Sequence, residues 1–574
     1  MTYRKRFAAL GMSLVLTASF FTGCNVKKSL PSLKSEEKES EIQSEFDTYT
    51  DELFEEEVTL NTIALHYTLA DPAAYGINDY EISLGSVTDE SLSESVTMLE
   101  NMRSSLDDFS YPALRDDQQL TYDILDDYSK LELDNAKLYL YSEVLQPSTG
   151  THTQLPVLLA EYTFRCEKDV TDYLELLSLL PSYFDEIIQF EKSKANAGLF
   201  MSKQNADTVI SQCQDFIENP KSCFLIETFD NRIESLSTLS TSAKEEYRSQ
   251  NETYVLKKII PAYKNLAAAI EELKDSGSNK GGLCNYEDGK DYYEYLVRYS
   301  TGSSDSIKDL QKQVEQKRKE DLLQLSELLT KNPILAKESE SYQLDTSDPS
   351  QILAQLKETI KKDFPEAPDA NFTVKYVDEA LEDYLSPAFY LTSPIDDYKE
   401  NSIYINEGSH YEKMKLFTTL AHEGFPGHMY QYAYMYENVG SNYIKALSNI
   451  SAYTEGYAVY AQYEALSYLD GVDQTLLEAY KENELATYCM IILADIGIHY
   501  DGWSVEEFKE FMESKGFSLD DASIQTQYAQ LQANPAAFEP YYVGYHEIIN
   551  MTHNRCLEVA FMKKSSTQLY WKVE

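Results

Sequence analysis

The residues best suited to chemistry lie in one short segment, residues 420–428, which reads Leu-Ala-His-Glu-Gly-Phe-Pro-Gly-His. A His-Glu pair followed shortly by a second His is typical of a zinc hydrolase. Two neutral imidazoles bind Zn²⁺, and the Glu beside the first handles the proton of a water that the metal activates. His422 and His428 are therefore candidate metal ligands, and Glu423 is the candidate general base.

The spacing of the two histidines departs from the usual form of this motif. The usual spacing of four places both imidazoles on one helix face, whereas here it is 428 − 422 = 6. Six steps of about 100° turn about 240° net, so a regular helix would point the second imidazole away from the first. Pro426 would also clash with the carbonyl of His422, and Gly424 and Gly427 loosen the turn. Either the helix breaks and a short loop returns His428 to the metal, or the motif is accidental.

A third ligand is expected from a later helix. Residues 411–421 predict a helix that leads into His422, and a second helix-like run ends near Leu469. A carboxylate from this second run would complete a His₂Glu site with one open position. Glu455 is the preferred candidate and Glu464, on the same run, is its rival. Either one could instead be a solvated carboxylate on a helix face.

The segment from His422 to His428 resembles the signature of the DUF885 family, bacterial proteins similar to zinc metallopeptidases of the thermolysin-like superfamily. Weaker blocks follow the family's order over most of the mature chain. They are Asp71-Pro72-x-x-Tyr75-Gly76, Tyr404-Ile405-Asn406, Glu455-Gly456-Tyr457-Ala458, Asp495-x-Gly497-x-His499 and Tyr541-x-x-Gly544. Tyr457 stands where the family has Trp. Residues 490–493 also lack the family's basic residue, so a contact to a substrate carboxylate is missing from the pattern.

The resemblance implies a zinc ligand set of His422, His428 and Glu455, with Glu423 as general base. It also points to His499 and Tyr541, which would stabilise the oxyanion or bind the substrate backbone. An imidazole N–H or a phenol can donate to a developing tetrahedral oxygen. The alternative for His499 is a structural histidine bonded to nearby backbone, and for Tyr541 it is packing. Tyr542 and Tyr545 are close rivals of Tyr541.

The elements that position these residues are expected to be mainly helices. Apolar residues at helical spacing predict long helices at 170–195, 253–276 and 306–331, with Pro261 as a kink in the second. Alternating stretches predict strands at 372–377 and 402–406.

The sequence thus predicts a mainly α fold, a large single helical domain with a small β-sheet near a metal-centred cleft. By the resemblance, residues 58–574 form this metallopeptidase-like domain.

Composition and charge exclude several classes of protein. The chain has 574 residues, of which 43% are hydrophobic and 25% charged, as in ordinary globular proteins. Lys and Arg number 49 and Asp and Glu 96, so the formal net charge is 49 − 96 = −47. Such a charge repels polyanions, and no nucleic-acid partner is expected.

The N-terminus predicts export and lipid anchoring. Residues 1–23 have the basic start and short apolar run of a signal peptide. Residues 21–24 read Phe-Thr-Gly-Cys, which resembles the bacterial lipobox, so Cys24 is expected to be lipidated. A plain secretory signal with a chance Cys is the alternative. Residues 24–57 predict an acidic tether, whose end from Phe46 could already be helical. The protein is therefore expected outside the cytoplasm, anchored to the cell membrane.

The leading functional hypothesis is a zinc-dependent hydrolase, a peptidase that cleaves small peptides outside the cytoplasm. One alternative is a substrate-binding lipoprotein without turnover, and another is a zinc hydrolase of a non-peptide amide or ester. The intact Glu423 argues against the binding protein, because metal retention needs the ligands but not the base. The sequence predicts no particular oligomeric state.

Overall fold

A computed structural model gives the fold of the chain. It describes residues 35–558 except 335–343, 345, 367, 378–381, 383–385, 409–412, 439, 441–442 and 448–449. The predicted signal peptide and Cys24 lie outside the described residues. None of the described helices is long and apolar enough to cross a membrane.

Helices dominate the described chain and confirm the mainly α prediction. They are α1 (Ser35–Thr59), α2 (Thr62–Thr68), α3 (Asp89–Asp107), α4 (Asp116–Asn135), α5 (Thr151–Glu161), α6 (Glu167–Ala197), α7 (Lys203–Phe216), α8 (Phe224–Ser235), α9 (Thr241–Tyr254), α10 (Ile260–Leu273), α11 (Gly289–Thr301), α12 (Ile307–Lys331), α14 (Pro349–Thr359), α15 (Lys413–Glu423), α16 (His428–Asn438), α17 (Ile444–Leu447), α18 (Ser451–Ala465), α19 (Gln474–Ile496), α20 (Val505–Ser514), α21 (Asp521–Ala533) and α22 (Glu539–Glu558).

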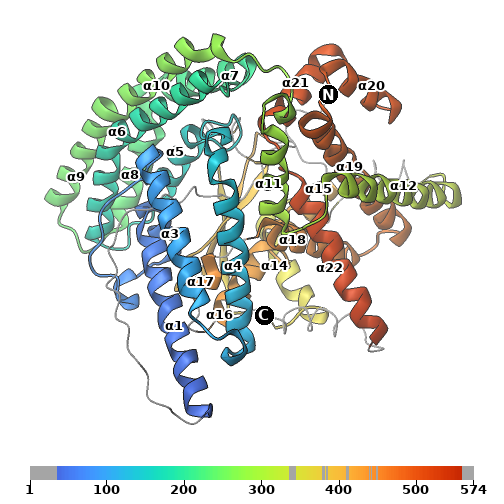
Figure 1. Cartoon of the computed structure of the whole chain (residues 1–574), viewed down its shortest axis with the longest axis horizontal. Helices are drawn as coiled ribbons and strands as arrows, with labels where there is room; N and C mark the ends of the chain where they lie inside the picture. The colour runs from blue at the N-terminus through green and yellow to red at the C-terminus, as the bar shows by residue number, and fades with distance from the viewer. Residues whose placement is uncertain are drawn as a thin grey trace.

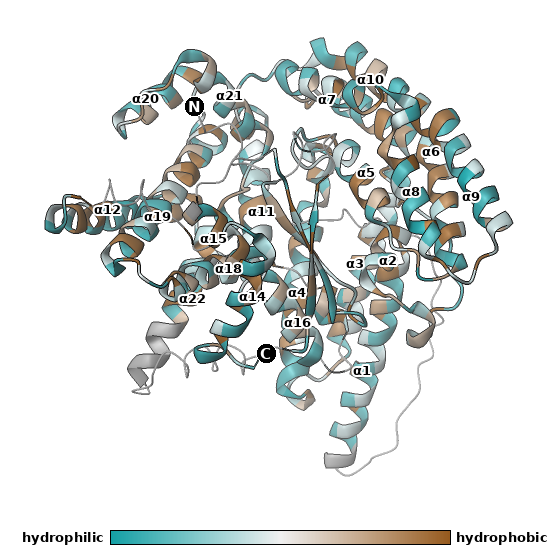
Figure 2. Cartoon of the chain, turned by 180° about the vertical axis from the view of Figure 1, so that it is seen from behind, coloured by the Kyte–Doolittle hydropathy of each residue, from teal (hydrophilic) through white to brown (hydrophobic). Residues whose placement is uncertain are grey.

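Two large groups of helices lie on either side of a small sheet. Figure 1 shows α5 to α10 gathered on one side, and α12, α14, α15 and α18 to α22 on the other. Each group encloses its own hydrophobic core. Figure 2, the view from behind, shows the strands between the two groups.

The sheet has three described strands in the order β1-β3-β2. They are β1 (Asn371–Tyr376), β2 (Ala388–Leu391) and β3 (Glu400–Ile405). β3 is central, parallel to β1 and antiparallel to β2. Because side chains alternate along a strand, Ile403 and Ile405 of β3 pack into the core of α12 to α22, while Tyr404 packs into the core of α5 to α10. The sheet therefore joins the two cores.

Most of the predicted elements are confirmed. The helices predicted at 170–195 and 306–331 correspond to α6 and α12. At 253–276 the helix continues through a π-helical turn, Val255–Ile259, which leaves Pro261 in the first turn of α10. The wider π turn just before the proline accommodates its ring, which in a regular helix would clash with the carbonyl four residues earlier. The predicted strands correspond to β1 and β3, and β2 was not predicted.

The predicted acidic tether is wrong in its extent. α1 begins at Ser35, well inside residues 24–57. Phe46, Leu53 and Phe54 are buried in a core shared with α3 and α4. The acidic residues of this segment belong to the solvated face of an amphipathic helix, so the folded part of the chain starts before residue 58.

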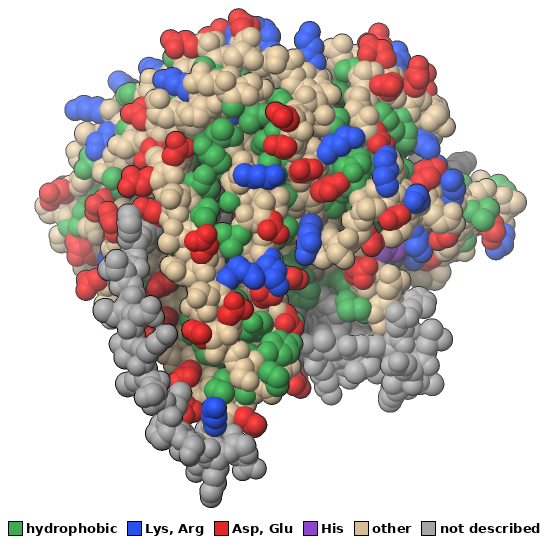
Figure 3. Space-filling model, in the orientation of Figure 1, with side chains coloured by type: hydrophobic (Ala, Val, Ile, Leu, Met, Phe, Trp, Pro, Cys, Tyr) green, Lys and Arg blue, Asp and Glu red, His purple; other side chains and the backbone are tan. Residues whose placement is uncertain are grey.

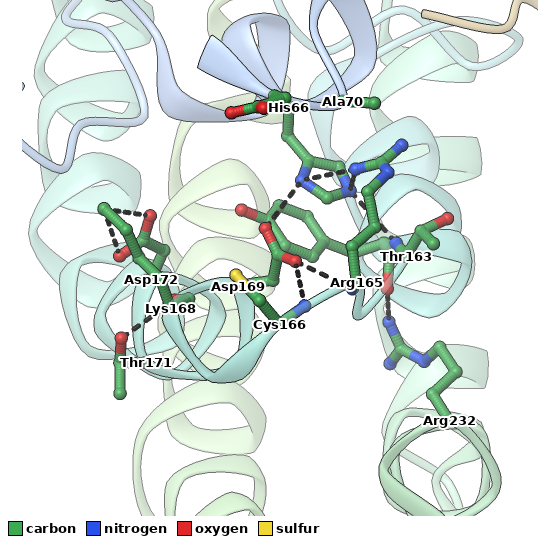
Figure 4. A network of polar contacts seen from close by, with 12 residues as sticks. His66, Ala70, Thr163, Arg165, Cys166, Lys168, Asp169, Thr171, Asp172 and Arg232 are labelled. Atoms are coloured by element: carbon green, nitrogen blue, oxygen red, sulfur yellow. Dashed lines mark hydrogen bonds and ion pairs between the residues drawn. The ribbon is translucent and has the colours of Figure 1, made fainter. Parts of the chain in front are cut away.

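A polar network around the buried His66 fastens α2 to the start of α6 (Figure 4). The backbone N–H of Thr163 donates to His66 Nε2 at 3.0 Å, and Arg165 Nη1 lies 3.3 Å from the same nitrogen. Asp169 in turn accepts from the backbone N–H of Arg165 at 2.7 Å. Burial, followed by the charges of Arg165 and Arg232, holds the pKa of His66 well below its usual value. His66 is thus a neutral structural histidine.

Candidate metal centre

The helix is interrupted between the two histidines of the motif. α15 carries His422 and Glu423 in its last turn, and α16 begins at His428. The backbone N–H of Gly427 donates to the carbonyl of Ala421 at 2.9 Å. A Cβ on Gly427 would lie 1.8 Å from the carbonyl oxygen of His422, so only glycine fits where the chain turns back. The helix break and the returning loop of the first sequence alternative are both present in the structure.

The loop between α15 and α16 brings the three predicted ligands together. Glu455 Oε2 lies 3.4 Å from His422 Nε2 and 3.5 Å from His428 Nε2. The three candidate ligand atoms lie within 4.8 Å of one another. The two imidazole rings are nearly perpendicular, at 87°, with centroids 4.7 Å apart. The rival Glu464 does not belong to this group, although it lies on the same helix.

A hydrogen bond fixes the orientation of His422. Its Nδ1 lies 2.9 Å from Gln462 Oε1, which can only accept. Nδ1 therefore carries the proton, and the lone pair of Nε2 faces Glu455. Gln462 was missed in the sequence, although it lies two helical turns after Glu455 and so shares its face of α18.

The residues present fit a zinc ion. Glu455 Oε2 is buried and has no hydrogen-bond partner among the described residues. A buried carboxylate oxygen that faces an imidazole lone pair is stabilised by a cation between them. Ligands at about 2.0–2.1 Å from a tetrahedral Zn²⁺ lie about 3.3–3.4 Å apart. The two contacts of Glu455 Oε2 have nearly this length.

The electrostatics of the group favour a positive charge between its members. Burial alone would raise the pKa of Glu455, but His428 and His422 outweigh it and lower that pKa to about 2. Burial alone would lower the pKa of His428, but the charge of Glu455 outweighs it and raises that pKa. The carboxylate is thus ionised, and a divalent cation would take the place of the proton that His428 attracts.

Glu423 lies beside this group and is only 6% exposed. Its Oε2 accepts the backbone N–H of Tyr390 in β2 at 2.9 Å. Burial raises the pKa of Glu423, so its affinity for a proton exceeds that of an ordinary glutamate. A carboxylate with raised pKa at a metal centre is suited to accept a proton from water and to return it.

Tyr541 reaches the same group from α22. Its ring lies nearly parallel to that of His422, with centroids 6.2 Å apart. Its hydroxyl is buried and has no hydrogen-bond partner in the described part of the chain. Burial, and next the charge of Glu455, raises the pKa of Tyr541 well above its usual value. The phenol therefore keeps its proton and is available as a donor.

The rivals of Tyr541 point elsewhere. The hydroxyl of Tyr542 donates to Asp321 Oδ2 at 3.1 Å. The ring of Tyr545 packs edge-on against Tyr463. Tyr542 directly follows Tyr541 and therefore points about 100° away from it around the helix.

Two glycines let α22 lie against the helix that carries Glu455. A Cβ on Gly456 would lie 2.3 Å from the carbonyl carbon of Gly544. A Cβ on Gly544 would lie 2.0 Å from the carbonyl oxygen of Ala452. The backbones of α18 and α22 thus touch, which places Tyr541 beside Glu455.

The contacts of His499 lie away from this group. The backbone N–H of Leu283 donates to its Nδ1 at 3.2 Å, so its Nε2 carries the proton and donates to the carbonyl of Leu531 at 3.0 Å. Burial lowers the pKa of His499 to about 4. Both ring nitrogens are occupied by backbone groups, which matches the structural alternative rather than a substrate contact.

Comparisons with known proteins agree on family and fold. A family model described as "Bacterial protein of unknown function (DUF885)" matches residues 72–554, more than half of the chain. None of the curated proteins matches.

Two solved structures are similar in fold, and both are described as a "putative lipoprotein". The one from Colwellia psychrerythraea has a TM-score of 0.77 at 17% identity, covering 92% of this chain and 95% of the other. The one from Shewanella oneidensis, described as of unknown function, has a TM-score of 0.62 at 15% identity, covering 91% and 95%.

Proposed function

The chain belongs to the DUF885 family, and we propose that it is a zinc-dependent hydrolase, a peptidase that cleaves small peptides outside the cytoplasm. One observation carries the proposal: His422 Nε2, His428 Nε2 and Glu455 Oε2 converge, with the carboxylate of Glu423 beside them. The kinship with thermolysin-like metallopeptidases that the motif indicates is part of the same proposal.

Zn²⁺ held by His422, His428 and Glu455 would supply a Lewis acid that polarises a carbonyl and lowers the pKa of water. Glu423 would take the proton of the attacking water and return it to the leaving nitrogen. The N–H of Tyr390 holds that carboxylate in place. The Tyr541 hydroxyl, protonated and without a partner among the described residues, would donate to the oxygen that becomes negative.

The position of β2 supports a peptide as the substrate. In an antiparallel pair, alternate residues turn their backbone groups away from the neighbouring strand. The N–H of Tyr390 reaches Glu423 and therefore points away from β3. The outer edge of β2 is thus turned toward the candidate base, where an extended peptide would pair with an edge strand.

The location outside the cytoplasm follows from the lipobox-like segment that ends at Cys24. The two structures of similar fold are themselves described as lipoproteins, which supports the same assignment here. A lipidated Cys24 would carry more than one acyl chain, enough for stable anchoring.

The test compares residues 25–574 with the variants Glu423→Gln and Glu455→Gln. Bound metal is measured by elemental analysis, and hydrolysis is followed on a library of short peptides. We expect one zinc per chain in the wild type and in Glu423→Gln, and little in Glu455→Gln. Hydrolysis should fall about 10²–10⁴-fold in Glu423→Gln, because the base is lost while the metal stays.

Each of these measurements can contradict a different part of the proposal. A wild type that holds no zinc after reconstitution would remove the metal centre. Unchanged hydrolysis in Glu423→Gln would remove this residue as the base. Zinc without cleavage of any peptide would favour the binding lipoprotein or a hydrolase of other amides or esters.

A further inference from the structure

Two buried carboxyl groups meet at one phenol beneath the start of α22. The Tyr293 hydroxyl lies 2.7 Å from Asp495 Oδ2 and 3.0 Å from Glu539 Oε1. Both carboxyl groups and the phenol are almost completely buried. A hydroxyl has a single proton to donate, so both contacts are hydrogen bonds only if one carboxyl is protonated and donates to the phenol oxygen. Asp495 and Glu539 therefore share one proton.

Backbone donors tie this pair to the turn before α22. The N–H of Ala536 donates to Asp495 Oδ2 at 3.0 Å, and the N–H of Phe538 lies 3.2 Å from Glu539 Oε2. Ala536 has a φ of +58°, in the left-handed region that residues with a Cβ rarely adopt. The carboxyl pair thus holds a strained turn in one conformation.

The same helical turn is held a second time by Tyr542, which donates to Asp321. At about 100° per residue, Tyr542 lies about 60° from Glu539 around the helix. Tyr541 lies about 200° from Glu539, on the opposite side. Two contacts on one side of α22 thus fix the direction in which Tyr541 points on the other.

We propose that Tyr293, Asp495 and Glu539 form a proton-sharing clamp that positions the Tyr541 hydroxyl at the candidate metal centre. The clamp rests on the proposed function, in which Tyr541 donates to the oxyanion. The three clamp residues act as positioning residues, because the hydrogen bonds described for them reach one another and the turn before α22.

The clamp gives the Asp495-x-Gly497-x-His499 block a physical role. Asp495 is one of its carboxyl groups. Gly497 lies so close to Trp503 that a Cβ would be 2.2 Å from the indole ring. His499 packs parallel to Tyr293, with ring centroids 5.7 Å apart, and donates to Leu531 near the end of α21. The block therefore braces both sides of the turn between α21 and α22.

The test is a double-mutant cycle between the clamp and Tyr541 in the zinc-loaded chain. Tyr293→Phe should lower kcat about 10–100-fold, since a misplaced group costs about 10²-fold per ångström, with KM and zinc content near those of the wild type. In a Tyr541→Phe background, Tyr293→Phe should cost nothing further, because the group that it positions is already gone. Glu539→Gln should keep the wild-type kcat, since the amide can donate to the phenol and still accept from Phe538.

Tyr295→Phe is the matched control. Tyr295 lies on the same helix as Tyr293, and its hydroxyl also donates to a carboxylate, Glu132, at 2.8 Å. Its loss removes a similar hydrogen bond away from α22 and should leave kcat unchanged. Equal losses from Tyr293→Phe in the wild-type and Tyr541→Phe backgrounds would show a purely structural role and overturn the clamp.

A second readout separates the clamp from the proposed function. Fluorotyrosine at position 541 reports the surroundings of that ring by ¹⁹F NMR, whether or not a substrate is known. We expect its resonance to shift or broaden in Tyr293→Phe and to stay in place in Glu539→Gln and Tyr295→Phe. An unchanged resonance in Tyr293→Phe would reject the clamp. A shifted resonance in a chain that cleaves no peptide would reject the proposed activity and keep the clamp.

Discussion

Gln462 decides which nitrogen of His422 faces the other candidate ligands. It accepts the proton of Nδ1 and so leaves Nε2 as the ligand atom. Replacing it by Leu keeps the approximate volume but removes the acceptor, and the ring is then free to rotate or change tautomer. We therefore expect Gln462→Leu to weaken zinc binding about 10–100-fold, measured by competition with a chelator of known affinity.

Glu464→Gln is the control for this prediction. Glu464 lies on the same helix and was the rival third ligand, but it is not among the three converging residues. Zinc affinity should therefore stay at the wild-type value. A Gln462→Leu variant that binds zinc as tightly as Glu464→Gln would contradict the role given to Gln462.

Glu191 makes stability depend on pH at a place remote from the motif. It is fully buried, and neither of its carboxylate oxygens has a hydrogen-bond partner in the described chain. Burial raises its pKa from 4.5 to about 7, with Lys194 opposing the rise and Glu143 adding to it. The folded state therefore binds this proton more tightly than the unfolded state. The stabilisation is complete below pH 4.5 and is lost as the pH rises through 7.

The variant Glu191→Gln should reveal this loss. It keeps the shape of the protonated side chain at every pH, so its melting temperature should exceed that of the wild type at pH 8 and approach it near pH 5. Glu175→Gln, at an exposed position on the same helix, should shift the melting temperature little at either pH. A gain in Glu191→Gln that is equal at both pH values would point to a cause other than titration.

Sequence patterns identified the groups able to do chemistry but not what surrounds them. The spacing of His422 and His428, with Pro426 and two glycines between them, predicted the helix break, because a proline removes a helical hydrogen bond and glycines loosen the turn. In the sequence, His499 and Tyr541 were equally good candidates for contacts to the oxyanion or the substrate. They differ in the structure because His499 is enclosed by backbone donors and acceptors, whereas Tyr541 is not. Only the tertiary packing decides this difference.

At the scale of elements, the site depends on how closely two helices approach. α18 carries Glu455 and α22 carries Tyr541, and they touch at Gly456 and Gly544. Such contacts join residues far apart in the chain and leave no periodic signal. β2 escaped prediction for a related reason. Its residues, Ala-Phe-Tyr-Leu, form a short apolar run without alternation, which a buried helix would show equally well.

Gly456→Ala tests this close approach. The added methyl would overlap the backbone of Gly544, so the helices must separate, at a cost of about 1–3 kcal/mol or more. Because Glu455 is the preceding residue, zinc affinity should fall together with the melting temperature.

Gly198→Ala is a useful contrast, since its Cβ meets nothing within 4 Å but its φ is +75°. Its cost of about 1–2 kcal/mol should leave zinc binding unchanged. Intact zinc affinity in a folded Gly456→Ala chain would show that the ligands tolerate the separation.

At the scale of the whole molecule, the two larger helical cores meet at one small sheet, and the candidate site lies at the outer strand of that sheet. Much of this could be predicted, since the apolar residues of the long amphipathic helices recur at helical spacing. The division into two cores was not, because it depends on which helix faces meet. The central strand β3 is covered by both cores, whereas the outer strand β1 is largely exposed and keeps an alternating pattern of burial.

The net charge of −47 acts on every ligand that approaches the molecule. Figure 3 shows acidic side chains spread over the visible face rather than gathered in one patch. A field of this kind reaches about 30 Å at 0.01 M ionic strength and about 8 Å at 0.15 M. It should therefore enrich cationic peptides near the protein and deplete anionic ones, mainly in dilute salt.

If the chain is a peptidase, its preference among peptides of equal length should follow this field. We expect kcat/KM at 0.01 M salt to be about tenfold or more higher for a peptide of net charge +1 than for one of −1. The ratio should fall toward unity at 0.15 M, because screening removes the long-range term and leaves the contacts intact. The charged residue is placed far from the scissile bond, so that no local subsite reads it. A ratio that persists unchanged in salt would assign the preference to a specific contact near the site instead of to the net charge.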